Sequence, residues 1–262
     1  FSWVEFLTAA LTLWCYGRGL GRTAPGLRPS AWRQAAVLAG VLASYAVLQT
    51  RFDYMAQHMF ALSRVQHMTT HHLGPFLIAL GWPGDTLQRG LPAPLRRLSA
   101  HPALVRAISL LQQPAPAALL FAGLIVLWLI PAVHFRAMID TRVYALMNWS
   151  MLGDGLLFWI LILDPRGKPP ALLSFGMRLL LVMAVQLPQI MLGAFISLTR
   201  QDLYPFYELC GRFYPSIPAQ LDQQLGGFVI YVGGGMMSAA AALILFGRLW
   251  RAETVAMATK CS

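Results

Sequence analysis

Residues 225–247 read LGGFVIYVGGGMMSAAAALILFG, a run of 23 residues without a charged side chain. A stretch of about 20 apolar residues is long enough for a helix to cross the hydrocarbon core of a bilayer. Similar apolar runs recur along the chain at 3–16, 31–50, 55–82, 116–132, 143–163 and 171–198. The sequence therefore predicts an all-α fold, a polytopic membrane helical bundle of about seven transmembrane helices.

The composition of the 262 residues agrees with a membrane protein. Hydrophobic residues make up 57% of the chain and charged residues 11%, whereas about a quarter of the residues in an ordinary soluble domain are charged. The two longest connections, 83–115 and 199–224, are interrupted by prolines and are too short for a core of their own. We therefore predict a single transmembrane domain over residues 1–262.

The basic residues are distributed unevenly between the two sets of connections. One set of connections, counted together with the adjoining ends of the spans, contains 14 Arg and Lys side chains and three acidic ones. The other set contains six basic and seven acidic side chains. Because cytoplasmic loops are enriched in Lys and Arg, we expect the N-terminus outside and the C-terminus inside. This distribution explains the net charge of +10 without nucleic-acid binding, since no basic run is interleaved with aromatic residues.

The predicted span 55–82 contains a polar stretch. Residues 55–72 include four histidines and three methionines, although ionisable side chains are costly in hydrocarbon and indicate a functional site. Imidazole nitrogen and thioether sulfur suit copper, especially Cu(I), and are a poor set for magnesium or calcium. We predict a copper site with the candidate ligands Met55, His58, Met59, His67, Met68, His71 and His72. For any single residue, packing or a hydrogen bond to a neighbouring helix is the alternative.

The geometry of a regular helix places these histidines at different depths. At 1.5 Å of rise per residue, His67 lies roughly 14 Å and His71 roughly 20 Å deeper than His58. Residues four apart, such as His67 and His71, share a helix face. Pro75 has no N–H to donate to the carbonyl of His71, so we expect the helix to bend where the histidines end.

Other polar residues in or near the predicted spans are expected to accompany this site. Asp154 is predicted at a depth comparable with Arg64 to His67, and an ion pair between Asp154 and Arg64 would neutralise both charges. Asp53, His134 and Asp222 are predicted to converge as an entrance at the outer face. The glycine run 233–235 permits a close helix approach or a local break.

Heme is the less favoured alternative to copper. A bis-histidine heme in a membrane bundle needs axial nitrogens from two facing helices, and outside residues 55–72 the chain has only His101 and His134. A heme with one protein ligand is still an alternative. A bound quinone is another alternative, although the sequence has no specific signal for it.

Four short elements, in order, resemble those of a known family. They are Q-H-M at 66–68 followed by Pro75 and by L-G-W-P at 80–83; G-L-L-F-W at 155–159; L-G-A at 192–194 with L-Y-P at 203–205; and D-Q-Q at 222–224. Through them the chain resembles the CtaG-type cytochrome c oxidase assembly factors. The resemblance implies a multi-pass protein of the bacterial cytoplasmic (inner) membrane that serves the maturation of a copper-containing respiratory oxidase.

The chain also departs from the pattern of that family. Ser63 stands where the family has a histidine four residues before the histidine of Q-H-M, and Phe76 replaces the second proline of its P-P. Met147 and Asn148 replace a Glu-His pair ahead of G-L-L-F-W. After D-Q-Q, Tyr231 and Gly233 replace a tryptophan and a proline. A copper role implied by the resemblance therefore transfers directly only to His67 and Met68.

Two function classes follow from these observations. The first is an accessory protein, not an enzyme, that binds Cu(I) on its outer half and passes it to the oxidase by ligand exchange. The alternative is a stable structural subunit that docks to a respiratory complex without metal transfer. The expected partners are membrane lipid, respiratory oxidase subunits and a periplasmic copper donor.

Overall fold

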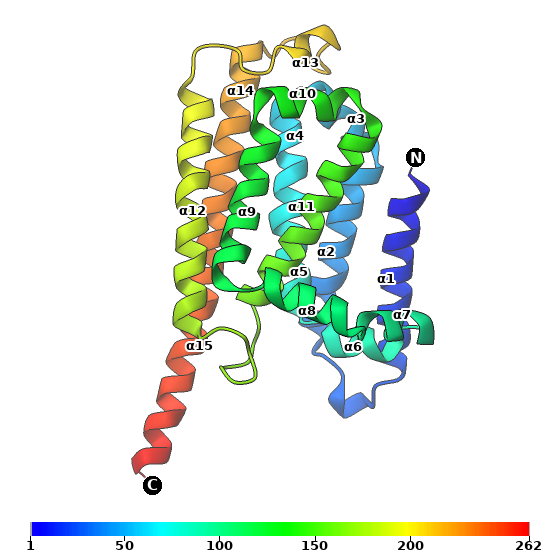
Figure 1. Ribbon diagram of the computed structural model, residues 1–262, viewed down its shortest axis with the longest axis vertical. Helices are drawn as coiled ribbons and strands as arrows, with labels where there is room; N and C mark the ends of the chain where they lie inside the picture. The colour runs from blue at the N-terminus through cyan, green and yellow to red at the C-terminus, as the bar shows by residue number, and fades with distance from the viewer. Residues whose placement is uncertain (1, 262) are drawn as a thin grey trace.

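The computed structural model describes residues 2–261 of the chain, and all regular secondary structure in that range is helical. Figure 1 shows long helices that run side by side along the longest axis of the molecule. They include α1 (Trp3–Gly21), α2 (Ala31–Gln49), α9 (Pro114–Leu129), α11 (Thr141–Ile162), α12 (Phe175–Leu198) and α15 (Gly234–Cys261). The predicted all-α bundle is confirmed.

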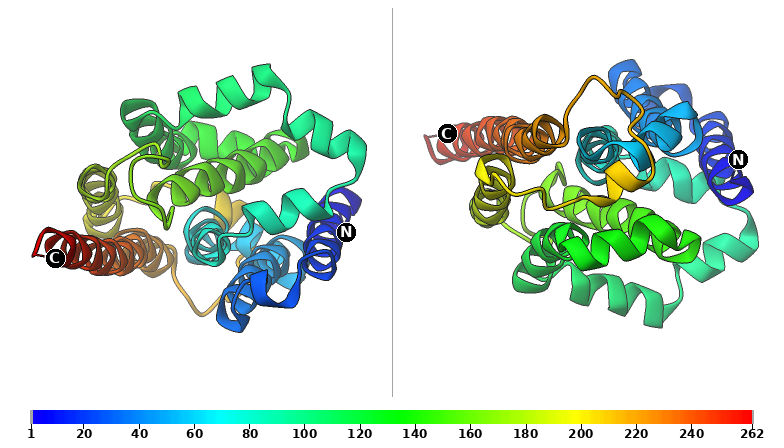
Figure 2. Two further views of the ribbon diagram at one scale, coloured as in Figure 1. Left: turned by 90° about the horizontal axis from the view of Figure 1, so that it is seen from below. Right: turned by 90° about the horizontal axis from the view of Figure 1, so that it is seen from above.

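Two further elements of the bundle are composite, because each contains a π-helical segment. The first comprises α3 (Arg51–His58), α4 (Phe60–His67), the π segment η2 (Met68–Leu73) and α5 (Gly74–Gly81). In the second, α14 (Ala219–Phe228) continues through the π segment η3 (Val229–Gly233) into α15. Figure 2 shows α12 and α15 on one side of the molecule and α1 on the other, with α4 and α5 between them.

Four helical stretches in residues 2–261 are long and apolar enough to cross a membrane. They are Ala31–Gln49, Thr141–Ile162, Phe175–Leu198 and Ala219–Thr254; the pair Pro102–Leu111 and Pro114–Leu129, bent by 76°, would make a fifth. These helices indicate a membrane protein, but the expected seven spans are not confirmed. Glu5 and Arg18 lower the hydropathy of α1, and Arg64 and the histidines lower that of the α4–α5 region.

Short helices close the two ends of the bundle. At one end lie α10 (Pro131–Ile139) and α13 (Phe206–Leu209); at the other lie α6 (Gly84–Gly90), α7 (Ala93–Ser99), α8 (Pro102–Leu111) and the 3-10 turn Pro25–Leu27. The second end contains the arginines of α6, α7 and α8. The basic connections therefore gather at one end, as expected, while the direction of insertion in the membrane stays a prediction.

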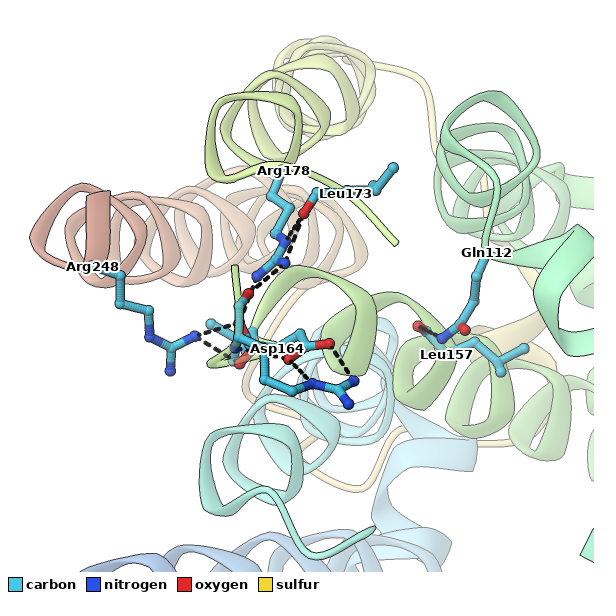
Figure 3. A network of polar contacts seen from close by, with 8 residues as sticks. Gln112, Leu157, Asp164, Leu173, Arg178 and Arg248 are labelled. Atoms are coloured by element: carbon cyan, nitrogen blue, oxygen red, sulfur yellow. Dashed lines mark hydrogen bonds and ion pairs between the residues drawn. The ribbon is translucent and has the colours of Figure 1, made fainter. Parts of the chain in front are cut away.

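At the basic end, two arginines bind the carbonyl groups that follow α11 (Figure 3). The Arg178 guanidinium, on α12, donates to the carbonyl oxygens of Leu173 and Asp164. Arg248, on α15, donates to the carbonyl oxygens of Leu163 at 2.7 Å and of Asp164 at 3.1 Å. Carbonyls at a helix C-terminus have no partner within the helix. These contacts therefore join α11, α12 and α15 at this end.

At the opposite end, the carboxylate of Asp222 binds the start of α4. The helix is interrupted at Met59, which has extended backbone angles of φ −148° and ψ 131°. Beyond the interruption, the backbone N–H groups of Phe60 and Ala61 donate to the two oxygens of Asp222 at 2.8 and 2.9 Å. Arg212 donates to the same carboxylate at 2.8 Å. Asp222, on α14, thus acts as the N-cap of a helix from a distant part of the chain.

The capping role of Asp222 predicts a large loss of stability for Asp222→Asn. The amide of Asn keeps one acceptor oxygen, but its NH2 group faces a backbone N–H that then has no acceptor. The substitution also removes the anion from the buried ion pair with Arg212. Removing one partner of such a pair costs about 3–5 kcal/mol, which should be measured as a lower thermal unfolding midpoint in detergent.

Asp140→Asn is the matched control, because Asp140 caps α11 through a single oxygen, Oδ1. Asn is about as good an N-cap as Asp, so the control should unfold near the wild-type temperature. Equal midpoints for the two variants would contradict the capping role.

Candidate functional site

The histidine-rich helix lies in the middle of the bundle (Figure 1). His67, His71 and His72 are all buried, with exposed fractions of 4%, 0% and 2%. The helix widens at η2, where the N–H of Gly74 donates to the carbonyl of Thr69, five residues back. π segments of this kind are frequent at functional sites.

The carbonyl of His71, which Pro75 leaves without an intrahelical donor, is bound from α11. The indole Nε1 of Trp159 donates to this oxygen at 3.2 Å. The approach requires Gly155, because a Cβ at that position would lie 2.3 Å from the same oxygen. The structure has a π segment at the place where a bend was expected, and the His71 carbonyl accepts from Trp159, which lies one turn along α11 from Gly155.

Gln66 links the histidine-rich helix to its neighbours. Its Nε2 donates to the Val47 carbonyl and to Asp53 Oδ1, each at 2.8 Å, and its Oε1 accepts from the Tyr144 hydroxyl at 3.1 Å. The single proton of this hydroxyl is shared with Asp53 Oδ1, which lies closer, at 2.6 Å. Both polar ends of the Gln66 amide are thus bound to α2, α3 and α11.

A small cavity lies beside η2. Its volume is about 20 Å³, enough for one water-sized species. Arg64, His67, Met68, His71 and His72 line it together with Ile125, Trp128, Leu129, Met151, Gln189 and Ile230. Four of the seven predicted ligands therefore face one enclosed space.

The imidazoles around this cavity differ in their hydrogen bonds. Both ring nitrogens of His67 are buried without a partner. His71 Nε2 lies 3.0 Å from Asp154 Oδ2 and His72 Nε2 lies 3.2 Å from Gln189 Nε2, while the Nδ1 atoms of both rings are buried without a partner. Buried polar atoms in proteins are nearly always hydrogen-bonded, so His67 is the exception that needs an explanation.

The predicted ion pair between Arg64 and Asp154 is wrong. Asp154 lies against His71, and within residues 2–261 no ion pair joins it to Arg64. The Arg64 guanidinium donates to Ser63 Oγ at 2.9 Å, stacks over the Phe60 ring at 4.9 Å, and has a buried Nε without a partner. Asp154 meets the central helix at His71, about two turns beyond Arg64, so the two charged residues do not lie at the same level as predicted.

The predicted ligands nearer the outer end do not line the cavity. His58 Nδ1 lies 2.7 Å from the Tyr54 carbonyl oxygen, one turn back on α3. Met59 is the buried residue at which the helix is interrupted, and Met55 is half-buried on α3. Across residues 2–261, no group of three or more His, Cys, Asp or Glu side chains is arranged to hold a metal ion.

Asp53, His134 and Asp222 do not surround one opening as expected. Asp53 lines an outer pocket of about 460 Å³, whereas Asp222 and His134 are each 1% exposed. His134 Nδ1 donates to the Trp128 carbonyl at 3.2 Å, and its Nε2 accepts from the Tyr207 hydroxyl at 2.8 Å. Burial keeps the pKa of His134 well below its ordinary value, so this ring is neutral and both of its nitrogens are in use.

Among the cavity-lining residues that the sequence did not predict, Met151 carries a thioether and Gln189 an amide. Met151 lies three residues before Asp154 on the same face of α11, a spacing that could have revealed it. Gln189 is a buried amide next to Pro188 in α12. Its Nε2 occupies space next to Gly234, where a Cβ would lie 2.3 Å away.

Comparison with known proteins identifies the family. The family model described as cytochrome c oxidase caa3 assembly factor (Caa3_CtaG) matches residues 14–252, nearly the whole chain. The chain belongs to this family. No curated protein and no solved structure matches it.

The contacts above assign physical roles to three of the residues that carry the Caa3_CtaG resemblance. Gln66, Trp159 and Asp222 each bind backbone or neighbouring side chains, and so stabilise the central helix. His67, in the same Q-H-M element as Gln66, has no such contact. Hydrogen bonds within the fold account for Gln66, Trp159 and Asp222, but no such bond accounts for His67.

The close approach of α11 to His71 predicts that Gly155→Ala is destabilising. The added methyl must displace the His71 carbonyl, and overpacking of this kind costs about 1–3 kcal/mol. Gly153→Ala is the matched control, because no atom lies within 4 Å of a Cβ there, and Ala in a helix is favoured over Gly by about 1 kcal/mol. Thermal unfolding in detergent should place the two variants on opposite sides of wild type, and a stabilising Gly155→Ala would refute the contact.

The absence of an anion at Arg64 predicts that Arg64→Met stabilises the metal-free protein. A buried guanidinium without a carboxylate loses its hydration and has no ion pair to compensate for the loss. Replacing buried charges by apolar residues raises the free energy of unfolding by about 1–4 kcal/mol. Arg178→Met is the matched control, because Arg178 is equally buried but bonded to several carbonyl oxygens. Its loss should lower the unfolding midpoint. If Arg64→Met lowers the unfolding midpoint as much as Arg178→Met does, then Arg64 has a partner.

Proposed function

We propose that this chain is an oxidase assembly factor that binds Cu(I) at the cavity beside η2 and passes it to a copper-containing respiratory oxidase. The assembly role follows from membership of the Caa3_CtaG family. The copper is cargo, received from a periplasmic donor and delivered to oxidase subunits within the bacterial cytoplasmic membrane. No bond-making catalysis is needed for this role.

The observation that supports copper binding is the state of His67. Its two ring nitrogens are enclosed in the protein without a hydrogen-bond partner, and leaving them so costs about 1–3 kcal/mol each. A ligand that accepts a nitrogen lone pair would remove that cost at one of the two nitrogens. The ring also faces a space for one small species.

The donor set around the cavity favours a soft cation. Met68 and Met151 place thioether groups on the lining together with the imidazoles, and thioethers select Cu(I) over harder ions. Gly233 makes room for Met68, because a Cβ there would lie 3.2 Å from Met68 Cγ. A volume of about 20 Å³ accommodates an ion but not a heme, so copper is preferred to the heme alternative.

Transfer would proceed by stepwise ligand exchange. Met55, His58 and Met59 lie towards the end of the bundle that contains α10 and α13, and we assign them the first contact with incoming Cu(I). His67 and Met68 would then bind it deeper in the bundle. The unpaired charge of Arg64 at the cavity opposes a second cation and favours release.

Copper stoichiometry of the purified, detergent-solubilised protein tests the proposal. The protein should bind one Cu(I) per chain in competition with a Cu(I)-chelating dye, and His67→Ala should lose that stoichiometry. His101→Ala, at an exposed histidine of the basic end, is the matched control and should bind as wild type does.

Two results would contradict the proposal. One is a bound stoichiometry that His67→Ala leaves unchanged. The other is a wild-type protein that binds no copper but co-purifies with oxidase subunits in fixed ratio, which would favour the stable structural subunit instead.

A further inference from the structure

We propose that Asp154 positions His71 as the second imidazole ligand beside His67, and that Gln189 keeps His72 in a tautomer that cannot bind metal. The inference rests on the proposed function, because it names which buried histidines take the Cu(I). It also narrows the sequence prediction, in which His71 and His72 are equivalent.

The contact with Asp154 leaves the lone pair of His71 on Nδ1. An ionised carboxylate can only accept, so with Asp154 in this form the Nε2 of His71, which lies 3.0 Å away, donates its proton to Asp154 Oδ2. A neutral imidazole that donates from Nε2 has its lone pair on Nδ1. That Nδ1 is buried without a partner on a ring that lines the cavity. The ring stacks on Phe121 at 4.2 Å, which fixes its plane.

This arrangement is the one that metal-binding histidines usually have. A ligating imidazole commonly donates its second N–H to a carboxylate, which orients the ring and makes the ligating nitrogen more basic. Asp154 touches His71 but is not among the cavity-lining residues. It is therefore a positioning residue and not a ligand.

The contact with Gln189 has the opposite effect on His72. Gln189 Nε2 lies 3.3 Å from the carbonyl oxygen of Ile230, which can only accept, so this end of the amide is the NH2 group. The same NH2 lies 3.2 Å from His72 Nε2. His72 Nε2 therefore accepts, and the proton of the ring is on Nδ1. The free nitrogen of His72 is an N–H, which cannot coordinate a metal.

Nitrogen NMR of the copper-free protein tests the tautomers directly, with histidines labelled by ¹⁵N. We expect the Nε2–H form for His71 and the Nδ1–H form for His72. Signals that disappear from the spectra of His71→Asn and His72→Asn assign the resonances of each ring. The opposite pair of tautomers, or the same tautomer for both rings, would overturn the inference. Because this measurement needs no copper, it stands even if the proposed function fails.

Copper affinity tests the positioning role. Relative to wild type, Asp154→Ala and His71→Ala should each weaken Cu(I) binding by about 10–100-fold, whereas His72→Ala should change it by less than about threefold. In the His71→Ala background, Asp154→Ala should have no further effect, because Asp154 acts through that ring.

The outcomes of the affinity series separate the two proposals. Copper bound by wild type but lost equally in His71→Ala and His72→Ala, or additive losses in the double variant of Asp154 and His71, would overturn the inference and leave the proposed function intact. No copper on wild type would overturn the proposed function, with the tautomers still measured by NMR.

Discussion

A bilayer core offers no water to polar groups, so the helix at the centre of this bundle must find its hydrogen-bond partners inside the protein. The three contacts that meet this constraint come from different neighbours. Asp222 binds the N–H groups at the start of α4, Gln66 binds α2, α3 and α11, and Trp159 binds the carbonyl that Pro75 leaves free. The arrangement of α2, α11 and α14 around the central helix follows from these bonds.

With those bonds made, the unsatisfied atoms are concentrated at the cavity. His67 has no hydrogen bond on either ring nitrogen, and one nitrogen each of His71 and His72 is free. The chain tolerates this cost beside two thioethers, in a space for one small ion. A site that binds Cu(I) transiently explains why polar atoms are left open here, while elsewhere in the same helix they are paired. Arg64 fits the same account, since a cation that is not neutralised limits how tightly copper is held.

The sequence was informative about helical periodicity and poor about the level at which neighbouring helices meet. It predicted the helical bundle, the free carbonyl at His71 and a close approach at the glycine run, because each depends on composition or on one proline or glycine. It did not predict that Asp154 meets His71 and not Arg64. Arg64 and His71 are seven residues apart and so lie near the same face of their helix, but Asp154 meets that helix about two turns beyond Arg64. Residue number gives the distance along one helix, whereas the level at which two helices meet depends on how they pack. The interruption at Met59 was missed because its cause, Asp222, lies far along the chain.

The most direct test of the copper site is an X-ray absorption spectrum of the Cu(I)-loaded, purified protein. Imidazole nitrogen and thioether sulfur scatter at different distances and with different strength. The account predicts one copper with both kinds of ligand, and a smaller sulfur contribution when Met68 is replaced by Leu. A spectrum that contains only nitrogen or oxygen ligands, unchanged by Met68→Leu, would contradict a site at the cavity beside η2.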